Sequence, residues 1–220
     1  DLGTANILIY AEGKGVVVRE PAVVAVDKNT GHILKVGAAA RNMLGRTPGN
    51  VVAMRPLKDG VISDHEMTVK MLTELIRSAT KSTLFTQKPR IVICVPSGVT
   101  EVEERTVINA AIEAGARRVY LIEEPLAAAL GANLDIEGPN GHMVVDIGAG
   151  TTDVAVVSMN GVAVSSSVEV AGDTFDEALA QSLPHTAVVR ITLTAPPVGK
   201  RKQYNEDGEE MKSPLTPQRN

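Results

Sequence analysis

The sequence predicts an α/β fold, and two observations support that prediction. Short apolar runs suited to buried strands, such as residues 91–95, alternate with segments such as residues 67–76, whose apolar side chains recur at helical spacing. Residues 63–66 and 100–103 have the Ser/Thr-x-x-Glu pattern of a capping box, which marks the start of a helix. Strands that alternate with helices in this way form sheets flanked by helices.

Apolar runs and the turn residues between them indicate the order of the elements. Strands are expected at residues 7–10, 16–18, 22–26, 33–36, 91–95, 119–122, 143–145, 154–157 and 162–170. Helices are expected at residues 38–44, from Ser63 onward, from Thr100 to Gly115, and at residues 125–130. Turns are expected at residues 13–15, 29–31 and 160–161, each between two strands.

Composition excludes some kinds of function. The 220 residues have a formal net charge of −4 and 2% aromatic residues, so we expect no nucleic-acid partner. The single cysteine, Cys94, lies in an apolar run, where an unreactive buried thiol is expected, and one cysteine without a disulfide suits a reducing cytoplasm. No apolar stretch reaches the roughly 18 residues of a membrane-spanning helix. We recognise no signal peptide, and a start without Met predicts a trimmed chain.

An internal repeat is the most informative feature of the sequence. The letters DIGAGTT at residues 146–152 precede a strand, a tight turn and a second strand, and DLGT at residues 1–4 begins the same succession. Two similar halves that face each other would place their acidic glycine turns across one cleft. Because the repeated letters are few, chance similarity is the alternative.

Both glycine turns have the composition of a phosphate-binding hairpin tip. They match neither a dinucleotide fold nor a P-loop, because the complete glycine motifs are absent and residues 152–156 are β-like rather than helical. A hairpin tip binds phosphate through converging backbone N–H groups, and glycine allows close approach. The aspartate before each tip would hold Mg²⁺ through water. The alternative is that Asp and Gly only make turns, but two matched hairpins favour a nucleotide.

The two turns resemble the phosphate loops of the actin, Hsp70 and sugar-kinase superfamily, and residues 123–129 resemble its connecting helix. Further motifs are similar to those of the MreB family of bacterial rod-shape filament proteins. They are Asn6, MLGRTPGN at residues 43–50, RPLKDGVI at residues 55–62 and CVPSGVT at residues 94–100. The resemblance covers residues 1–181.

The resemblance implies an actin-like ATPase fold, in which a ribonuclease H-like mixed sheet is flanked by helices. Residues 1–23 and 59–140 would form the core of the first lobe, residues 24–58 an inserted small subdomain, and residues 141–181 the start of an incomplete second lobe. Residues 182–220 do not match the family pattern, and we expect a frameshifted or truncated gene product. Their proline-rich, polar composition predicts disorder, apart from one strand within residues 185–194.

The resemblance also implies that ATP and Mg²⁺ bind between the turns. Asp1 and Asp146 would be the carboxylates for Mg²⁺. The residues along the phosphates would be Thr4, Ala5, Asn6, Gly148, Ala149, Gly150 and Thr151. The family usually has Gly at position 149 and Glu at position 153, where this chain has Ala and Asp, and alanine suits the turn only if its φ is negative. The α-amino group of Asp1 would add a cation beside the metal.

Glu103 has two interpretations. It aligns with the family glutamate that positions the attacking water at the γ-phosphate, so the resemblance implies a catalytic role. It is also the third helical residue of the Thr100 capping box, where its function would be to cap the helix. The residues alone favour the cap, the resemblance favours catalysis, and both roles can hold at different times.

Leu84 and Phe85 are two apolar residues in an otherwise polar loop. The resemblance implies that this loop inserts into the membrane. The alternative is a loop that folds onto its own domain.

The implied function is that of a bacterial cytoskeletal protein that binds ATP and polymerises into membrane-associated filaments, which guide cell-wall synthesis and rod shape. Its partners would be like subunits, the inner membrane surface and the membrane-bound elongation machinery, and it would be cytoplasmic and peripheral at that membrane. ATPase activity is expected of the full-length family member and is expected to be impaired in this chain. The alternatives are a truncated or frameshifted remnant without ATPase activity and an Hsp70-like chaperone ATPase.

Overall fold

The structure is a computed structural model that describes residues 1–44, 49–80, 88–182, 203–204 and 210–211. The chain divides into two compact units, Asp1–Ser182 and Leu183–Asn220. In the second unit, β13 (Gln203–Tyr204) pairs with β14 (Glu210–Met211) in an antiparallel ladder. The predicted tail therefore contains a short strand pair. The strand predicted within residues 185–194 lies outside the described residues, where disorder also stays a prediction.

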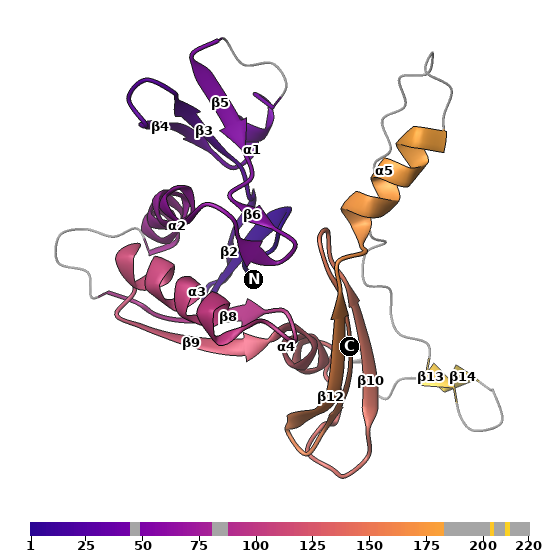
Figure 1. Cartoon of the computed structure of the whole chain (residues 1–220). Coiled ribbons are helices and arrows are strands. Elements are labelled where there is room, and N and C mark those ends of the chain that lie inside the picture. The colour runs from indigo at the N-terminus through magenta and orange to yellow at the C-terminus, as the bar shows by residue number, and fades with distance from the viewer. Residues whose placement is uncertain (45–48, 81–87, 183–202, 205–209, 212–220) are drawn as a thin grey trace, which may run out of the picture. The chain divides into compact units, whose positions relative to one another are not determined.

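The first unit begins with an antiparallel hairpin (Figure 1). Its strands are β1 (Asn6–Ala11) and β2 (Gly15–Pro21). Gly13 in the turn and Gly15 at the start of β2 both have positive φ. This is the hairpin that the sequence predicted. Just before β1, the first glycine turn is closed by a bridge between Leu2 and Ile7.

A three-stranded antiparallel sheet of order β4-β3-β5 comes next in the chain. Its elements are β3 (Val24–Asp27), β4 (Ile33–Val36), the short helix α1 (Ala38–Arg41) and β5 (Val51–Met54). The sheet and α1 share a small core of their own, formed by Val23, Ala25, Ala40 and Val51. The helix is shorter than the predicted 38–44, because the amides of Met43 and Leu44 bond three residues back in tight turns instead of continuing the α-helix.

The main core of the first unit lies between two helices, the β1–β2 hairpin and a second pair of strands (Figure 1). The helices are α2 (His65–Thr80) and α3 (Glu101–Glu113), and the strands β8 (Arg90–Val95) and β9 (Arg118–Glu123) pair in parallel. Alternate residues of β8, Ile93 and Val95, point into this core and pack with Met71, Val107 and Ile7 of the neighbouring elements. Cys94, between them, faces the other side and is half-buried.

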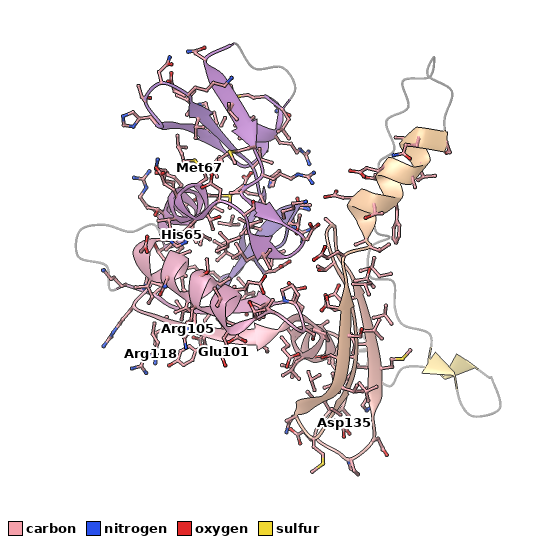
Figure 2. The ribbon with its side chains drawn as sticks, in the orientation of Figure 1. His65, Met67, Glu101, Arg105, Arg118 and Asp135 are labelled. Carbon is pink, nitrogen blue, oxygen red and sulfur yellow. The ribbon has the colours of Figure 1, made fainter. Side chains whose placement is uncertain are left out.

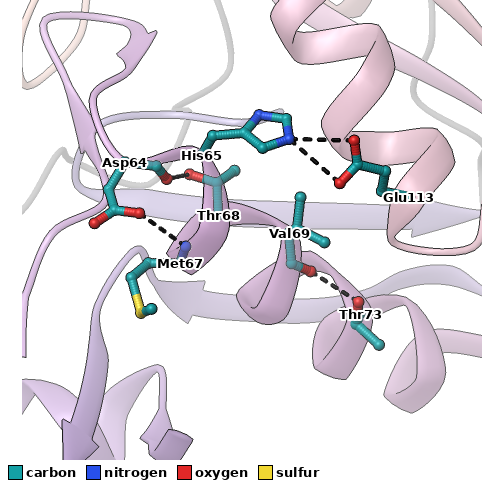
Figure 3. Close-up of polar contacts among 7 residues, drawn as sticks. All are labelled: Asp64, His65, Met67, Thr68, Val69, Thr73 and Glu113. Carbon is teal, nitrogen blue, oxygen red and sulfur yellow. Dashed lines mark hydrogen bonds and ion pairs between the residues drawn. The ribbon is translucent and has the colours of Figure 1, made fainter. Parts of the chain in front are cut away.

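The start of α2 differs from the sequence prediction by one residue. The carboxylate of Asp64, not the hydroxyl of Ser63, accepts the amide of Met67 at 2.9 Å and caps the helix (Figure 3). Ser63 instead donates its hydroxyl to the carbonyl of Pro56 at 3.0 Å, which explains why it cannot serve as the cap. At the first residue of α2, His65 Nε2 lies 3.3 Å from Glu113 Oε2 and joins α2 to α3.

The start and end of α3 confirm the sequence prediction. Thr100 and Glu103 form both hydrogen bonds of the capping box, and the helix gives way at Ala114 to Gly115, which has a φ of 110°. Such a left-handed residue is a common helix end, and glycine adopts it without strain.

The last part of the first unit is a helix on one face of an antiparallel sheet of order β10-β11-β12. The elements are α4 (Glu124–Gly131), β10 (His142–Ile147), β11 (Thr152–Ser158), β12 (Gly161–Val168) and α5 (Gly172–Ser182). α4 covers Val157, whereas the opposite face exposes apolar side chains, among them Met143 (70% exposed) and Val164 (62% exposed). Within the described residues, no helix has the length and apolarity needed to span a membrane.

The turn between β11 and β12 lies one residue earlier than predicted. Met159 and Asn160 have positive φ and form the turn, while Gly161 already pairs with Ser158. Their amides donate to the carbonyls of Gly138 and Ile136, respectively, which holds the turn in this register.

Candidate nucleotide site

The two glycine turns that the repeat placed across one cleft are in contact. Gly150 of the second turn is buried, and a Cβ built on it would lie 2.8 Å from the hydroxyl oxygen of Thr4 in the first turn. It would also lie 2.8 Å from the Cα of Asp59. Real Cβ atoms do not come so close to other atoms, so this junction requires glycine.

A third segment, which was not predicted to belong to the site, completes this junction. β6 (Leu57–Lys58) and β7 (Val61–Ile62) form a hairpin whose two turn residues, Asp59 and Gly60, both have positive φ. The amide of Gly60 donates to Thr4 Oγ1 at 2.9 Å. Asp-Gly between short apolar segments is a strong hairpin signal, so this turn was predictable, although its contact with Thr4 was not.

Backbone amides at both turns are free to bind an anion. Among the hydrogen bonds of the described residues, none is donated by the amides of Thr4, Ala5, Ala149, Gly150 or Thr151. Thr4, Gly150 and Thr151 are buried residues, and a backbone N–H that is shielded from water needs an acceptor. Phosphate oxygens would supply the acceptors that these groups lack.

The other residues predicted to line the phosphates flank these groups. Asn6 is exposed at the start of β1, and the carbonyl of Ala5 accepts the amide of Ala22. Gly148 donates its amide to the carbonyl of Thr151 at 2.9 Å, which closes the second turn. Ala149 does not have a positive φ, so alanine suits this position of the turn.

Carboxylates concentrate at the base of the second turn. Asp146 and Asp153 lie opposite each other on β10 and β11, and Glu124 begins α4 beside them. Burial, together with the charges of Asp153 and Asp146, raises the pKa of Glu124 to about 7, and the α-amino group of Asp1 opposes this shift. Burial, followed by the charge of Asp153, also raises the pKa of Asp146.

This donor set fits a Mg²⁺ ion. Mg²⁺ prefers carboxylate oxygens and retains several waters, and its charge would offset the repulsion among these carboxylates. No group of three or more His, Cys, Asp or Glu side chains converges on one point within the described residues. Binding of Mg²⁺ by Asp1 and Asp146 through water therefore stays a prediction. The α-amino group of Asp1 donates to the carbonyl of Leu8 at 2.9 Å.

Asp153 also connects β11 to the turn before α3. Its Oδ1 accepts the amide of Ser97 at 2.8 Å, and both residues are buried. The hydroxyl of Ser97 in turn donates to Glu123 Oε2 at 2.8 Å. In the sequence, Asp153 stood out only as a departure from the family pattern, and neither Ser97 nor Glu123 was predicted to belong to the site.

Glu103 occupies the capping position in this structure. Its Oε2 accepts the amide and the hydroxyl of Thr100 at 2.7 and 2.8 Å, and these bonds lower its pKa. Glu103 also lines a cavity of about 40 Å³ together with Gly60 and Val61 of the β6–β7 hairpin. Glu101 instead lies on the outer side of α3 near Arg105, as Figure 2 shows, with 3.8 Å between the charged atoms. The catalytic role of Glu103 stays a prediction.

Leu84 and Phe85 lie outside the described residues, so their predicted insertion into the membrane stays a prediction as well.

The family model described as "MreB/Mbl protein" matches residues 1–195 of the chain. The cell shape-determining protein Mbl of Bacillus subtilis is 56% identical over 80% of this chain and 53% of its own length. MreB of Escherichia coli K12 is 52% identical over 81% of the chain and 53% of its own length. The chain thus spans about half the length of these curated relatives.

The likeness extends past residue 181, where the motifs alone predicted that it would end. The family model reaches residue 195, and MreB of Haemophilus influenzae is 47% identical over 96% of this chain and 62% of its own length. The named relatives are cell shape-determining proteins, so neither the chaperone nor the remnant is favoured.

Solved structures show the same fold. Spiroplasma citri MreB5 bound to ADP has a TM-score of 0.76 and 41% identity, over 82% of this chain and 54% of that one. The AMPPNP-bound form of MreB5 has a TM-score of 0.75, with the same identity and coverage. The MamK double helical filament has a TM-score of 0.68 and 25% identity, over 82% of this chain and 56% of that one. The chain therefore has the actin-like fold and belongs to the MreB/Mbl family.

Proposed function

We propose that this chain forms the phosphate-binding part of an actin-like cell shape-determining protein that binds ATP with Mg²⁺ between its two glycine turns. The contact between Gly150 and Thr4 carries this proposal, because it brings the free amides of both turns to one place. The ADP-bound and AMPPNP-bound structures of MreB5 support it, since those proteins share this fold and hold adenine nucleotides.

Each group in the site has a distinct task in this proposal. The amides of the two turns bind the phosphate oxygens, while Asp1 and Asp146 hold the waters of Mg²⁺, which neutralises phosphate charge. Glu103 positions the attacking water. To do so, its carboxylate has to leave the amide and hydroxyl of Thr100.

The same proposal includes assembly at the membrane. Subunits join into filaments, and the structure of the MamK double helical filament, which has the same fold, supports this step. The filaments lie against the inner face of the cell membrane, where Leu84 and Phe85 insert, and they guide cell-wall synthesis together with the membrane-bound elongation machinery. The protein is cytoplasmic and peripheral at that membrane.

Nuclear magnetic resonance of the ¹⁵N-labelled chain tests nucleotide binding at the turns. We expect Mg²⁺·ATP at high concentration to shift the amide signals of Thr4, Ala5 and residues 149–151 together. AMP, which lacks the β- and γ-phosphates, should leave them nearly unchanged. Signals that shift only elsewhere, or equal shifts with AMP, would remove the phosphate assignment.

A further inference from the structure

An ion pair joins two segments that are distant in the sequence. Arg55, between β5 and β6, donates from Nη1 to Asp173 Oδ2 at 2.7 Å, and the two side chains are 41% and 40% exposed. Among the described residues, this is the one salt bridge that connects the chain before β10 with the chain after it. It therefore joins the two parts of the fold whose turns meet at the candidate site.

Asp173 is bonded directly to the second glycine turn. Its amide donates to the carbonyl of Ala149 at 2.9 Å, and the amide of Gly172 donates to the carbonyl of Gly148 at 3.1 Å. A Cβ on Gly172 would lie only 3.1 Å from that same carbonyl oxygen. The start of α5 and residues 148–149 are therefore expected to move together.

Residues 55–60 consequently hold the second turn at two points. One is the close packing of Asp59 against Gly150, and the other is the ion pair from Arg55 to Asp173. We propose that the Arg55–Asp173 pair is a salt-sensitive latch, which fixes residues 55–60 against the second glycine turn. Arg55 is then a positioning residue that acts on Gly148 and Ala149 through Asp173.

The two contacts differ in a way that suits a latch. An exposed ion pair is weak and is screened by salt, so it opens and closes readily. Close packing of backbone atoms does not depend on salt, so the contact of Asp59 with Gly150 persists and serves as the pivot. The consequence for ATP rests on the proposed function, whereas the latch itself does not.

Distances between two spin labels test the latch in the full chain. The labels are attached at Asn29→Cys, in the turn between β3 and β4, and at Glu177→Cys, on α5, in a Cys94→Ala background; both labelled positions are exposed. We expect one narrow distance distribution at low salt. Arg55→Ala should broaden it, and so should about 1 M salt, where the Debye length is about 3 Å.

Further variants separate the latch from a general loss of structure. The exchange Arg55→Asp with Asp173→Arg should restore a narrow distribution at low salt. Arg77→Ala is the matched control, because it breaks the exposed 2.6 Å pair with Glu74 inside α2 and should change nothing. An Arg55→Ala chain with the unmodified distribution would overturn the latch, even if ATP binds. If Arg55→Ala broadens the distribution but no variant binds Mg²⁺·ATP, the latch stands and the nucleotide proposal fails.

Discussion

Gly150 packs against the hydroxyl of Thr4, although the two residues are far apart in the sequence of the first unit. A Cβ placed at position 150 would lie 2.8 Å from Thr4 Oγ1, which leaves no room for any other amino acid. The two glycine turns therefore form one structural unit, to which the Asp59–Gly60 turn contributes a third segment.

Gly150→Ala should destabilise the chain by about 1–3 kcal/mol, the usual cost of forcing an extra carbon into a packed site. The methyl group would meet the backbone of Asp59, which cannot rotate away as a side chain can. Urea denaturation followed by circular dichroism measures the loss. Gly131→Ala is the control, because a Cβ there meets nothing within 4 Å. Equal stability of the two variants would show that the turns do not touch.

The capping role and the catalytic role of Glu103 predict different outcomes. Thr100→Ala removes the cap and should cost about 1 kcal/mol of stability in the chain. In a full-length version, Glu103→Ala should leave nucleotide binding intact and slow phosphate release strongly, as measured by a phosphate-release assay. Normal turnover in that variant would assign Glu103 to the cap alone.

The buried carboxyl of Glu124 predicts a pH dependence of stability. Its pKa is about 7 in the folded chain and near the ordinary 4.5 in the unfolded chain, so the folded state holds the proton more tightly. The contribution of Glu124 to the free energy of unfolding should therefore fall as the pH rises from about 4.5 to about 7. Glu124→Gln should be more stable than the unchanged chain at pH 8 and similar to it at pH 4. If denaturation gives the same difference in free energy of unfolding between Glu124→Gln and the unchanged chain at every pH, the raised pKa of Glu124 is contradicted.

Local signals predicted most of the fold, because each needs only a few neighbouring residues. The capping box of α3, the glycine at its end and the first hairpin all follow from spacing and residue type. The predicted helix start and turn position were wrong where a group distant in the sequence forms a hydrogen bond with a residue of the local pattern. Ser63 matched a capping pattern, but the carbonyl of Pro56 engages its hydroxyl, and carbonyls in residues 136–138 fix the β11–β12 turn one residue early.

The site was predictable only in part for the same reason. Asp146 and the glycine turns carry recognisable motifs, and their pairing follows from the internal repeat. The hydrogen bond from Ser97 to Asp153 and the ion pair from Arg55 to Asp173 join residues 56 and 118 positions apart. Such contacts depend on how the elements pack, which no window of sequence reveals.

The chain should bind ATP weakly, with a dissociation constant well above the micromolar range. The sheet formed by β10, β11 and β12 leaves its second face open, with Met143 and Val164 exposed, and the chain spans about half the length of its relatives. Groups that would contact the base and ribose are therefore expected beyond these residues. Titration with fluorescent ATP in Mg²⁺ measures the affinity, and micromolar binding would show that these turns suffice.

Paramagnetic broadening by Mn²⁺, in place of Mg²⁺, tests most directly whether the two glycine turns share one metal–phosphate site. With ATP present, amide signals of residues 2–6 and of residues 147–151 should broaden at the same low Mn²⁺ concentration, and Asp146→Asn should abolish both effects. Broadening of one group without the other, or of neither, would contradict a shared site.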